Sequence, residues 1–400
     1  MKSIFYIKLV LFFITQFIVA QPSTMSIEQI LKSGSLEMGT VSTETVPIFY
    51  QKKMPFVKVE MNTNTYLFLV DTGSSLCIIS KDMLGPDNVV LDKKSVTDVG
   101  GSEFQTEVVL STLKIGNSYF KKVACLVGSI DSISTQGCLK IDGIIGSNLL
   151  KLSNWEINPV NQTLSFSTNP FEKKENSIEL DFELSDSFLP LIQYNFMDEV
   201  IFSVIDTGYS DYFEMNNYFL KKVSKQKRGK LNMGKGKHAI GINSTISGTL
   251  TTTIIDTIKV NPVFFSKVPV IFTENKPRIG SAFLANYIFN YNFLAKKIIL
   301  TPVNTNPITE KVHCVNFSIN ESNELIVSFV WLNEQTKKSK IEVGSKVLKI
   351  DDMTCYDMTM KKLCELKQYI DTKDTIVLTL LNANKVTEHT LFKIDKFPME

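Results

Sequence analysis

The sequence predicts a mainly β protein made of two similar lobes, followed by a small α+β unit. Three observations lead to this prediction. Short apolar segments rich in Val, Ile, Phe, Tyr and Thr alternate with clusters of Gly, Asn, Asp and Ser, which is the chemistry of strands and turns. A set of motifs recurs later in the chain, which indicates a duplicated unit. After Pro302 the composition turns polar, and a different order of elements begins near residue 310.

The composition limits the possible partners. The 400-residue chain, 44% hydrophobic, is long enough for more than one core. Its 43 basic and 41 acidic residues leave a formal charge of +2, so no field of one sign favours nucleic acid. We therefore expect no nucleic acid among the partners, which must be recognised at specific sites. We also expect a monomer.

The N-terminal end predicts export. A basic start with Lys2 and Lys8 precedes an apolar run from Leu9 to Ala20, which is typical of a secretory signal peptide over residues 1–20. The alternative is an uncleaved anchor, but Lys8 and Gln16 interrupt the roughly 20 apolar residues that a membrane span requires. No later segment is apolar for long enough to span a bilayer. We expect an exported protein, periplasmic or secreted, with no stable span after cleavage.

Six cysteines in an exported chain permit disulfide bonds. Cys125 with Cys138 is the pair that most merits a test, although two small buried hydrophobic side chains are an equally good interpretation. Cys77, inside the apolar stretch from Leu76 to Ile79, is expected in the core. The cysteine spacing matches no zinc pattern and the three histidines stand apart, so we expect no metal site and no cofactor.

The repeat begins with two copies of one tripeptide. The apolar strand from Leu67 to Val70 leads into Asp71-Thr72-Gly73, and the strand from Phe202 to Ile205 leads into Asp206-Thr207-Gly208. The two aspartates are 135 residues apart (206 − 71). Because a single tripeptide pair could arise by chance, the segments that follow decide whether the chain is duplicated.

Those downstream segments also match. A segment after the first motif, Ile144-Ile145-Gly146-Ser147, matches a segment after the second, Arg278-Ile279-Gly280-Ser281. The glycines lie 75 (146 − 71) and 74 (280 − 206) residues after their aspartates. Strand-like segments at 155–158 and 164–166 recur at 289–292 and 298–300. The matched spacing predicts two homologous lobes, over residues 51–170 and 171–303. Residues 21–50 lack strong periodicity and are interpreted as a leader or a first strand packed on the lobe.

Each Asp-Thr-Gly motif combines residues with separate chemical uses. The aspartate holds or accepts a proton, the threonine hydroxyl can bond neighbouring backbone, and the glycine tolerates a tight turn close to a partner. If a two-fold axis brings both loops together, like-charge repulsion keeps one proton shared between Asp71 and Asp206. Such a pair contains a base that activates water and an acid that protonates the oxyanion.

The two loops, Asp71 to Ser75 and Asp206 to Ser210, resemble the catalytic loops of pepsin-like and retropepsin-related aspartic peptidases. The resemblance covers roughly residues 50 to 303. It implies a two-lobed pepsin-like β-barrel fold and an aspartic endopeptidase that cleaves peptide or protein substrates. It also implies two catalytic aspartates, Asp71 and Asp206, with loop support from Thr72, Gly73, Ser74, Thr207 and Gly208.

The resemblance implies in addition a hairpin that covers the substrate. Val99, Gly100 and Gly101, within residues 96–113, look like this flap in the bacterial members of the family. A plain Gly-Gly turn is an almost equally good interpretation of the same residues. No tyrosine lies in this stretch, so the flap hydrogen bond of pepsin-like relatives is in doubt.

Two residues depart from the family pattern. Tyr209 stands where the family usually has a Ser or Thr whose hydroxyl bonds the outer carboxylate oxygen. Arg278 replaces an apolar residue under the second loop, and near Asp206 its charge would weaken the shared-proton arrangement. We expect Arg278 to face outward. The departures support an alternative function, a catalytically silent two-lobed peptide-binding protein, whereas the two intact Asp-Thr-Gly triplets favour the enzyme.

The segment from Gly229 to Lys235 fits the start of a phosphate-binding loop. Gly236, however, stands where a Ser or Thr is needed to hold magnesium, and no helix pattern follows. We expect a basic flexible loop here.

A polar linker at 304–309 precedes the last unit, over residues 310–400. Its order of elements resembles a PDZ domain, which implies a possible C-terminal peptide ligand. The segment that matches the carboxylate-binding loop, Glu321 to Glu324, has no glycine and two acids, so a structural role is equally open. We predict that a chain ending near Val303 folds and cleaves short peptides. The pattern consists of a strand from Leu325 to Leu332, a Gly-turn and strand within Val343 to Asp352, a helix at 359–370 and a strand from Thr375 to Leu381.

Overall fold

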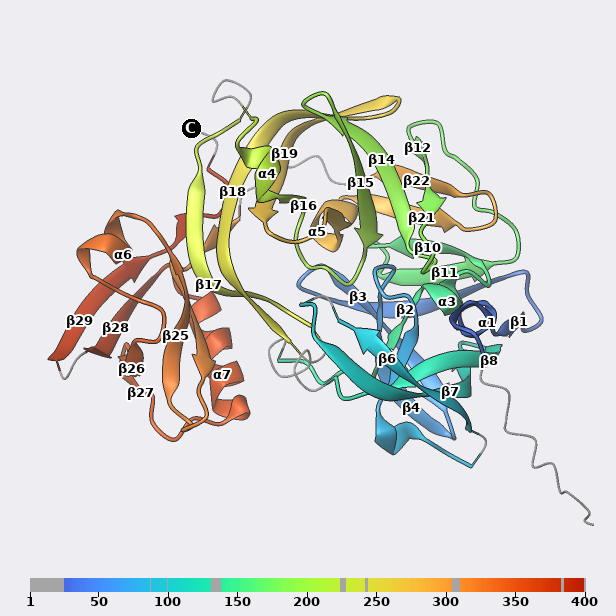
Figure 1. The fold of residues 1–400 in the computed structure, drawn as a ribbon, viewed down its shortest axis with the longest axis horizontal. Coiled ribbons are helices and arrows are strands. Elements are labelled where there is room, and N and C mark those ends of the chain that lie inside the picture. Colours follow the sequence, from blue (N-terminus) through green and yellow to red (C-terminus); the bar gives the residue numbers. More distant parts are fainter. Residues whose placement is uncertain are drawn as a thin grey trace, which may run out of the picture.

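The computed structural model describes residues 25–86, 88–98, 100–130, 138–223, 228–241, 244–303, 310–382 and 385–398. Two β-rich lobes pack against each other, and a smaller unit of strands and helices lies beside the second lobe (Figure 1). The predicted fold class, a mainly β chain with a two-lobed aspartic-protease-like architecture, is confirmed. The expected signal peptide and the linker at 304–309 lie outside the described residues. Within these ranges no helix has the length and apolar character needed to cross a membrane.

Residues 26–51 are built into the first lobe. Helix α1 (Ile27–Lys32) begins at Ser26, whose side chain and that of Gln29 cap each other's backbone N–H groups. Strand β1 (Ser35–Glu37) pairs with β8 (Ser118–Val127), and β2 (Thr43–Gln51) pairs with β3 (Met54–Met61) and β11 (Thr163–Ser167). Both strands of this segment therefore pair with strands of the first lobe.

The two lobes repeat one arrangement of strands. In the first, β4 (Asn64–Val70) runs parallel to β9 (Gly143–Ile145), which is antiparallel to β5 (Cys77–Ile79). In the second, β15 (Glu199–Asp206) runs parallel to β20 (Arg278–Gly280), which is antiparallel to β16 (Phe213–Asn216). Each apolar-Gly motif thus lies directly beside the strand that leads into its Asp-Thr-Gly loop. The remaining elements of the first lobe are η1 (Lys81–Met83), β6 (Val89–Thr97), β7 (Glu103–Ile115) and α3 (Ser147–Leu150). Those of the second are β12 (Ile178–Asp181), β13 (Glu183–Leu184), β14 (Pro190–Phe196), α4 (Asn217–Leu220), β17 (Asn232–Ile240), β18 (Thr245–Val260), β19 (Val263–Thr273) and α5 (Ser281–Leu284).

A shared sheet joins the lobes. It contains β10 (Asn154–Asn158) and β11 from the first lobe, and β21 (Tyr287–Asn292) and β22 (Lys297–Pro302) from the second. Strands β10 and β21 are antiparallel neighbours with Glu156 opposite Asn290, and Asn290 Nδ2 donates to Glu156 Oε2 at 2.9 Å. These two residues are repeat equivalents, 134 positions apart (290 − 156). Their pairing places the pseudo-two-fold axis between them.

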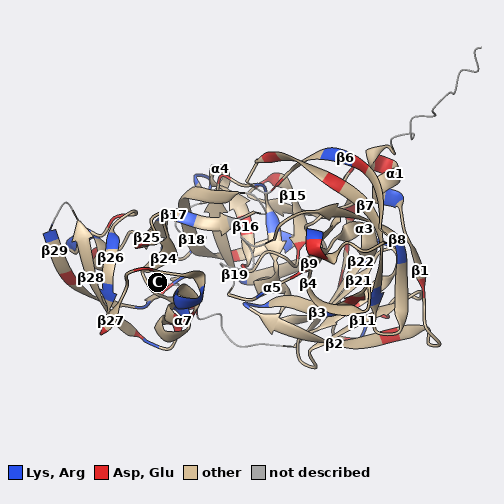
Figure 2. Ribbon diagram, turned by 90° about the horizontal axis from the view of Figure 1, so that it is seen from below, with Lys and Arg blue, Asp and Glu red and all other residues tan. Residues whose placement is uncertain are grey.

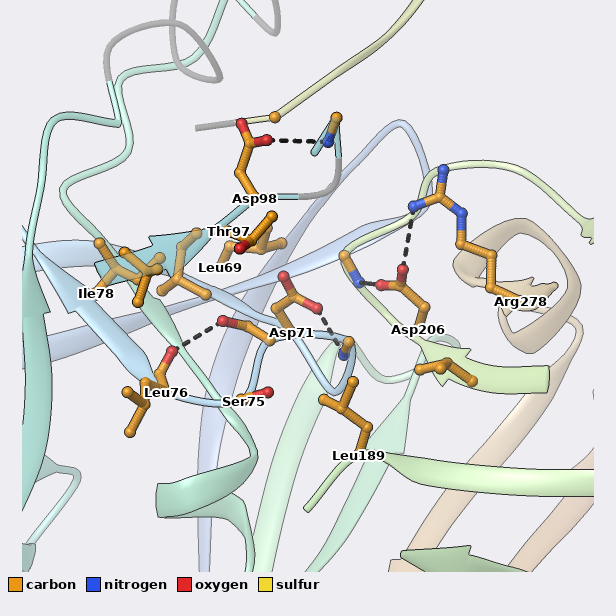
Figure 3. A pocket seen from close by; sticks show the side chains of 18 of the residues that line it. Leu69, Asp71, Ser75, Leu76, Ile78, Thr97, Asp98, Leu189, Asp206 and Arg278 are labelled. Atoms are coloured by element: carbon orange, nitrogen blue, oxygen red, sulfur yellow. Dashed lines mark hydrogen bonds and ion pairs between the residues drawn. The ribbon is translucent and has the colours of Figure 1, made fainter. Parts of the chain in front are cut away.

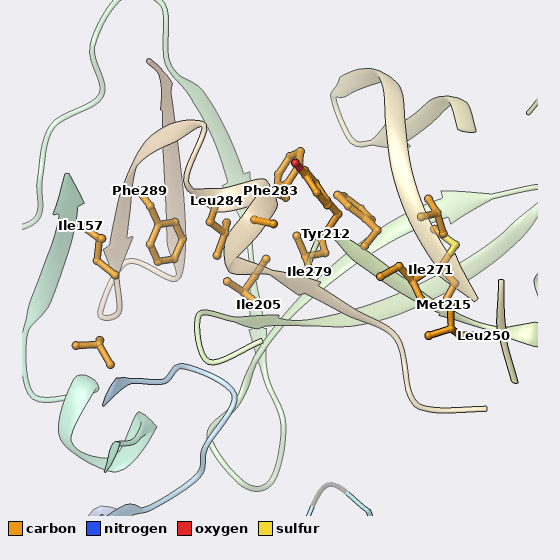
Figure 4. Close-up of a cluster of buried hydrophobic side chains, with 14 of the residues drawn as sticks. Ile157, Ile205, Tyr212, Met215, Leu250, Ile271, Ile279, Phe283, Leu284 and Phe289 are labelled. Carbon is orange, nitrogen blue, oxygen red and sulfur yellow. The ribbon is translucent and has the colours of Figure 1, made fainter. Parts of the chain in front are cut away.

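The loops rest on a rigid core. Under the second loop, Ile205, Ile279 and Phe283 belong to one buried cluster (Figure 4). The Phe283 ring meets Phe213 and Phe265 edge-on, with centroids 5.0 and 5.2 Å apart. Full burial of a side chain of this size contributes roughly 1.5–3 kcal/mol. The core therefore fixes the backbone from which the loop projects.

The third unit contains the elements that the sequence predicts. The helix expected at 359–370 is α7, and its buried side chains Leu363, Leu366 and Ile370 lie on one face at helical spacing. Lys, Arg, Asp and Glu are interspersed along all three units (Figure 2). The elements are β23 (Lys311–Val312), β24 (Val315–Ile319), β25 (Leu325–Trp331), α6 (Glu334–Lys338), β26 (Lys346–Ile350), β27 (Met353–Thr354), α7 (Met360–Asp371), β28 (Thr375–Asn382), β29 (Lys385–Phe392) and β30 (Ile394–Asp395).

A continuous sheet connects the second lobe to the third unit. Strand β17 pairs with β25, with Gly234 opposite Trp331 and Gly236 opposite Phe329. A Cβ on Gly234 would lie 2.2 Å from the Phe329 ring, and Gly236 has φ +123°. The prediction of a flexible loop is therefore wrong from Asn232 onward, because these glycines admit a neighbouring strand at close range.

The cysteines differ from the expected pairing. Cys138 forms a disulfide with Cys364 on α7, and the two Cα atoms are 5.4 Å apart. Cys125 is a free thiol, buried beside Cys77 at paired positions of β8 and β5. The Cys125–Cys138 pair is thus wrong, since sheet pairing places Cys125 inside the core. The expectation that Cys77 is a core residue is confirmed.

Candidate active site

The two Asp-Thr-Gly loops meet at the interface of the lobes. Asp71 directly follows β4, and Asp206 is the last residue of β15. A Cβ on Gly73 would lie 2.5 Å from Asp206 Cγ, and one on Gly208 would lie 2.4 Å from Asp71 Cγ. Each carboxyl group therefore packs over the glycine of the opposite loop, a position that any larger residue would fill (Figure 3).

The threonines of the motifs bind the loops to each other. Thr72 Oγ1 donates to Ile205 O at 2.6 Å and accepts from Thr207 N at 3.0 Å. Thr207 Oγ1 donates to Val70 O at 2.7 Å and accepts from Thr72 N at 3.0 Å. Both threonines are buried. These reciprocal hydrogen bonds fix the spacing of the two aspartates.

The aspartates and the segments beside them are held in nearly the same way. Gly73 N donates to Asp71 Oδ1 at 2.8 Å, and Gly208 N donates to Asp206 Oδ1 at 3.0 Å. Ser147 N donates to Ser74 O, and Ser281 N donates to Tyr209 O, each at 2.7 Å. The Ser74 hydroxyl donates to Leu76 O at 2.8 Å, so Ser74 supports its loop through backbone carbonyl groups. The structure thus brings together all seven predicted catalytic and supporting residues.

Arg278 does not face outward, and that expectation is wrong. Its side chain is 13% exposed, its Nη1 lies 3.4 Å from Asp206 Oδ2, and its Nε donates to Glu214 Oε2. The guanidinium carbon lies 3.7 Å from the centroid of the Tyr209 ring. The inward orientation is stable because Glu214, opposite Arg278 in the β16–β20 pair, supplies a buried counter-charge.

Glu214 is the site residue that the sequence interpretation missed. It is 1% exposed, and its Oε1 accepts hydrogen bonds from Thr273 Oγ1 at 2.7 Å and Asn275 Nδ2 at 2.8 Å. The available sequence signal was an acid between two apolar residues, Phe213 and Met215, in a predicted β segment. A charge at such a position is buried only with a partner.

Electrostatics differ between the two carboxyl groups. Burial raises the pKa of Asp71 well above its usual range, and the Asp206 charge and a hydrogen bond to Asp206 add to this. The hydrogen bond from Gly73 N and the more distant charge of Arg278 act in the opposite direction. The positive charge of Arg278 lies closer to Asp206, with Nη1 3.4 Å from Oδ2. The raised pKa favours a proton on Asp71, and the Arg278 cation faces Asp206.

A cleft of about 910 Å³ contains both aspartates. Gly100 and Gly101, at the turn between β6 and β7, line it, while Val99 lies outside the described residues. Ser244 Oγ donates to Asp98 Oδ2 at 2.6 Å, which links this turn to the β17–β18 hairpin of the second lobe. Within the described ranges, no group of three or more His, Cys, Asp or Glu side chains is arranged to hold a metal ion.

Comparisons with known proteins agree with part of this description. A family model described as aspartyl protease matches residues 57–149, the segment from β3 to α3 that contains Asp71. The similarity to an aspartyl protease therefore lies in the first lobe. No curated protein matches the sequence. Among solved structures the chain is similar to basic 7S globulin from soybean, with 8% identity, a TM-score of 0.42, and coverage of 65% of this chain and 95% of that chain.

Proposed function

We propose that the protein is an aspartic endopeptidase that hydrolyses peptide bonds with a water held between Asp71 and Asp206. One observation carries the proposal: each carboxyl group lies over the glycine of the opposite loop, at the floor of a shared cleft. The reciprocal threonine hydrogen bonds fix this geometry before a substrate arrives. The aspartyl protease match over the first lobe supports the same assignment.

We propose proton transfers in which Asp206 acts as the base and Asp71 as the acid. The ionised Asp206 takes a proton from the water while the water oxygen attacks the carbonyl carbon of the peptide. The protonated Asp71 donates its proton to the carbonyl oxygen, and a tetrahedral gem-diol forms. When the C–N bond breaks, the nitrogen takes the proton that Asp206 accepted, and Asp71 recovers its own from a hydroxyl of the gem-diol. Both groups return to their starting states, with no covalent intermediate.

The cleft suggests the class of substrate. Apolar side chains from the first lobe, including Leu69, Ile78 and Ile144, line it next to Asp71. We propose that it binds an extended peptide with an apolar side chain beside the cleaved bond. The Gly100–Gly101 turn would cover this peptide as a flap. We propose export to the periplasm or cell exterior, supported by the apolar run before residue 21, and a PDZ-like role for the third unit.

A second candidate function is a peptide-binding protein that does not cleave. The observation that favours it is Arg278, a cation in contact with a carboxylate that the reaction needs. Glu214 neutralises this cation, and both Asp-Thr-Gly triplets are intact. We therefore rank the peptidase first.

One experiment distinguishes the peptidase from the peptide-binding protein. The mature protein is incubated with a peptide library, with and without a chelator, beside an Asp71→Asn variant. Asp256→Asn, which alters a surface carboxylate paired with Lys267, is the matched control. We expect chelator-insensitive cleavage by the wild type and the control, and a loss on the order of 10⁴-fold in Asp71→Asn. Retention of peptides without cleavage by the wild type would instead support the binding protein.

A further inference from the structure

We propose that Arg278, held in place by Glu214 and Tyr209, is a catalytic residue that donates a hydrogen bond to Asp206 and keeps Asp206 the ionised member of the pair. The inference deepens the proposed function, and its catalytic consequence rests on it. The protonation that it assigns to the two carboxyl groups does not require cleavage activity.

The two carboxylate oxygens of Asp206 have different partners. Oδ1 accepts from Gly208 N, as Asp71 Oδ1 accepts from Gly73 N. Oδ2 faces Arg278 Nη1 at 3.4 Å. In the described part of the chain no Lys or Arg forms an ion pair with Asp71. One cation therefore discriminates between two carboxyl groups whose glycine contacts are the same.

Tyr209 and Arg278 depart from the repeat together because they form one unit. Tyr209 occupies the position of Ser74 in the first loop, and its ring packs on the guanidinium group. A Cβ on Gly280 would lie 2.6 Å from Tyr209 Cδ1, so this glycine leaves the space that the ring needs. The stacked ring restricts the guanidinium to the face directed at Asp206.

Glu214 makes the buried cation compatible with the shared proton. At the same register of the first lobe, Ile78 lies opposite Ile144; in the second, Glu214 lies opposite Arg278. An unpaired arginine here would leave a buried positive charge and favour ionisation of both aspartates. Because Glu214 cancels most of that charge, Arg278 acts mainly through its short contact with Asp206.

Few other titratable groups face this cluster. The phenol of Tyr209 is neutral, because burial and then the charge of Glu214 raise its pKa. His238 on β17 feels both Glu214 and Arg278, and burial lowers its pKa, which keeps it neutral near pH 7. Asp211 is paired with Lys396. The charges that decide the state of the pair are therefore those of Asp71, Asp206, Glu214 and Arg278.

The test uses substitutions with opposite expected effects. Arg278→Ile with Glu214→Ile copies the Ile144 and Ile78 pair of the first lobe and removes the donor to Asp206. Glu214→Gln keeps Arg278 but removes its counter-charge. Arg278→Lys, which retains a cation, checks that the fold tolerates a change at this position. The readouts are the pH dependence of peptide cleavage and a carboxyl ¹³C NMR titration of the aspartates.

In the double variant we expect the acidic limb of the pH–activity profile and the midpoint of the NMR titration to move upward by about one pH unit. In Glu214→Gln both should move downward by a similar amount. Arg278→Lys should stay closer to the wild type than the double variant does. An unshifted NMR titration in a folded Glu214→Gln protein, or shifts of the same sign in Glu214→Gln and the double variant, would overturn the proposal. Shifted titrations in a protein that cleaves no peptide would support the role of Arg278 and contradict the proposed function instead.

Discussion

The two Asp-Thr-Gly loops have nearly the same backbone contacts but different surroundings. The first loop stands on the apolar pair of Ile78 and Ile144. The second stands on the Glu214–Arg278 ion pair and is also contacted by the third unit. In that contact, Lys396 Nζ lies 2.6 Å from Asp211 Oδ1, and the Phe397 ring meets Tyr212 edge-on at 5.4 Å.

This difference shows that a symmetric backbone can carry an asymmetric site. The threonine and glycine contacts, which set the positions of the carboxyl groups, obey the two-fold relation between the lobes. The contacts that set charge and loop rigidity do not. Those of the second loop include ion pairs and an aromatic contact, and they come from distant parts of the chain. We therefore expect the second loop to be the more sensitive to changes elsewhere.

The largest expected effect follows from removal of the third unit. From the sequence, a chain ending near Val303 is expected to fold and keep activity. The structure argues against this, because the truncation exposes the β17 edge, removes the Lys396 partner of Asp211 and deletes Cys364. We now expect a truncated chain that aggregates or binds a hydrophobic dye, measured by size-exclusion chromatography and fluorescence. A monomeric, fully active truncated protein would show that the second loop is self-sufficient.

The sequence predicts the loops better than their surroundings, for a physical reason. The Asp-Thr-Gly motifs and the apolar-Gly segments recur at matched spacing, and strand pairing then places them side by side. The inward orientation of Arg278 depends on Glu214, 64 residues away (278 − 214), and a burial pattern does not reveal such a partner. The Lys396–Asp211 and Cys138–Cys364 contacts span 185 and 226 residues. Contacts that join one unit to another carry no local signal.

The disulfide ties the third unit to the first lobe. Cys138 precedes Leu139 and Ile141, which line the cleft. Cys364→Ser should lower the free energy of unfolding by about 2–4 kcal/mol, because the cross-link restricts the unfolded chain. Urea unfolding should give the same free energy of unfolding for the variant and for the reduced wild-type protein. A variant as stable as the oxidised wild type would mean that this bond contributes nothing to the attachment.

The Lys396 ion pairs test the support of the second loop. Its side chain is 14% exposed, and it pairs with Asp211 and with Glu310 at 3.1 Å. Lys396→Met should destabilise the protein by about 2 kcal/mol, less than the 3–5 kcal/mol of a fully buried pair, since both acids remain partly exposed. Lys267→Met, which breaks a surface pair, should cost under about 1 kcal/mol. Equal effects of the two substitutions in urea unfolding would contradict the assigned support.

The smallest expected effect distinguishes the two aspartates by stability. The pKa of Asp71 is raised in the folded protein, mainly by burial, so the folded state binds a proton that the unfolded state releases above the ordinary Asp pKa. Folding stability is therefore lost as pH rises from that value toward the folded pKa. Asp71→Asn removes this loss, and its melting temperature should exceed that of the wild type near neutral pH, with no gain in strong acid.

Asp206→Asn should show no such gain, because the amide removes the anion that faces Arg278. Melting temperatures measured across pH for both variants check this difference. If the melting temperatures of the two variants rise equally near neutral pH, the site is electrostatically symmetric and the assigned roles are incorrect.

The central claim, that one dyad built from both loops cleaves peptides, is tested most directly by the activity of Asp71→Asn, Asp206→Asn and the double variant on one peptide. Residues that act as a unit lose nearly all activity when either is replaced, so all three proteins should fall within about tenfold of one another. Their folds should match the wild type by circular dichroism. Substantial cleavage by Asp206→Asn beside an inactive Asp71→Asn would contradict the two-loop mechanism.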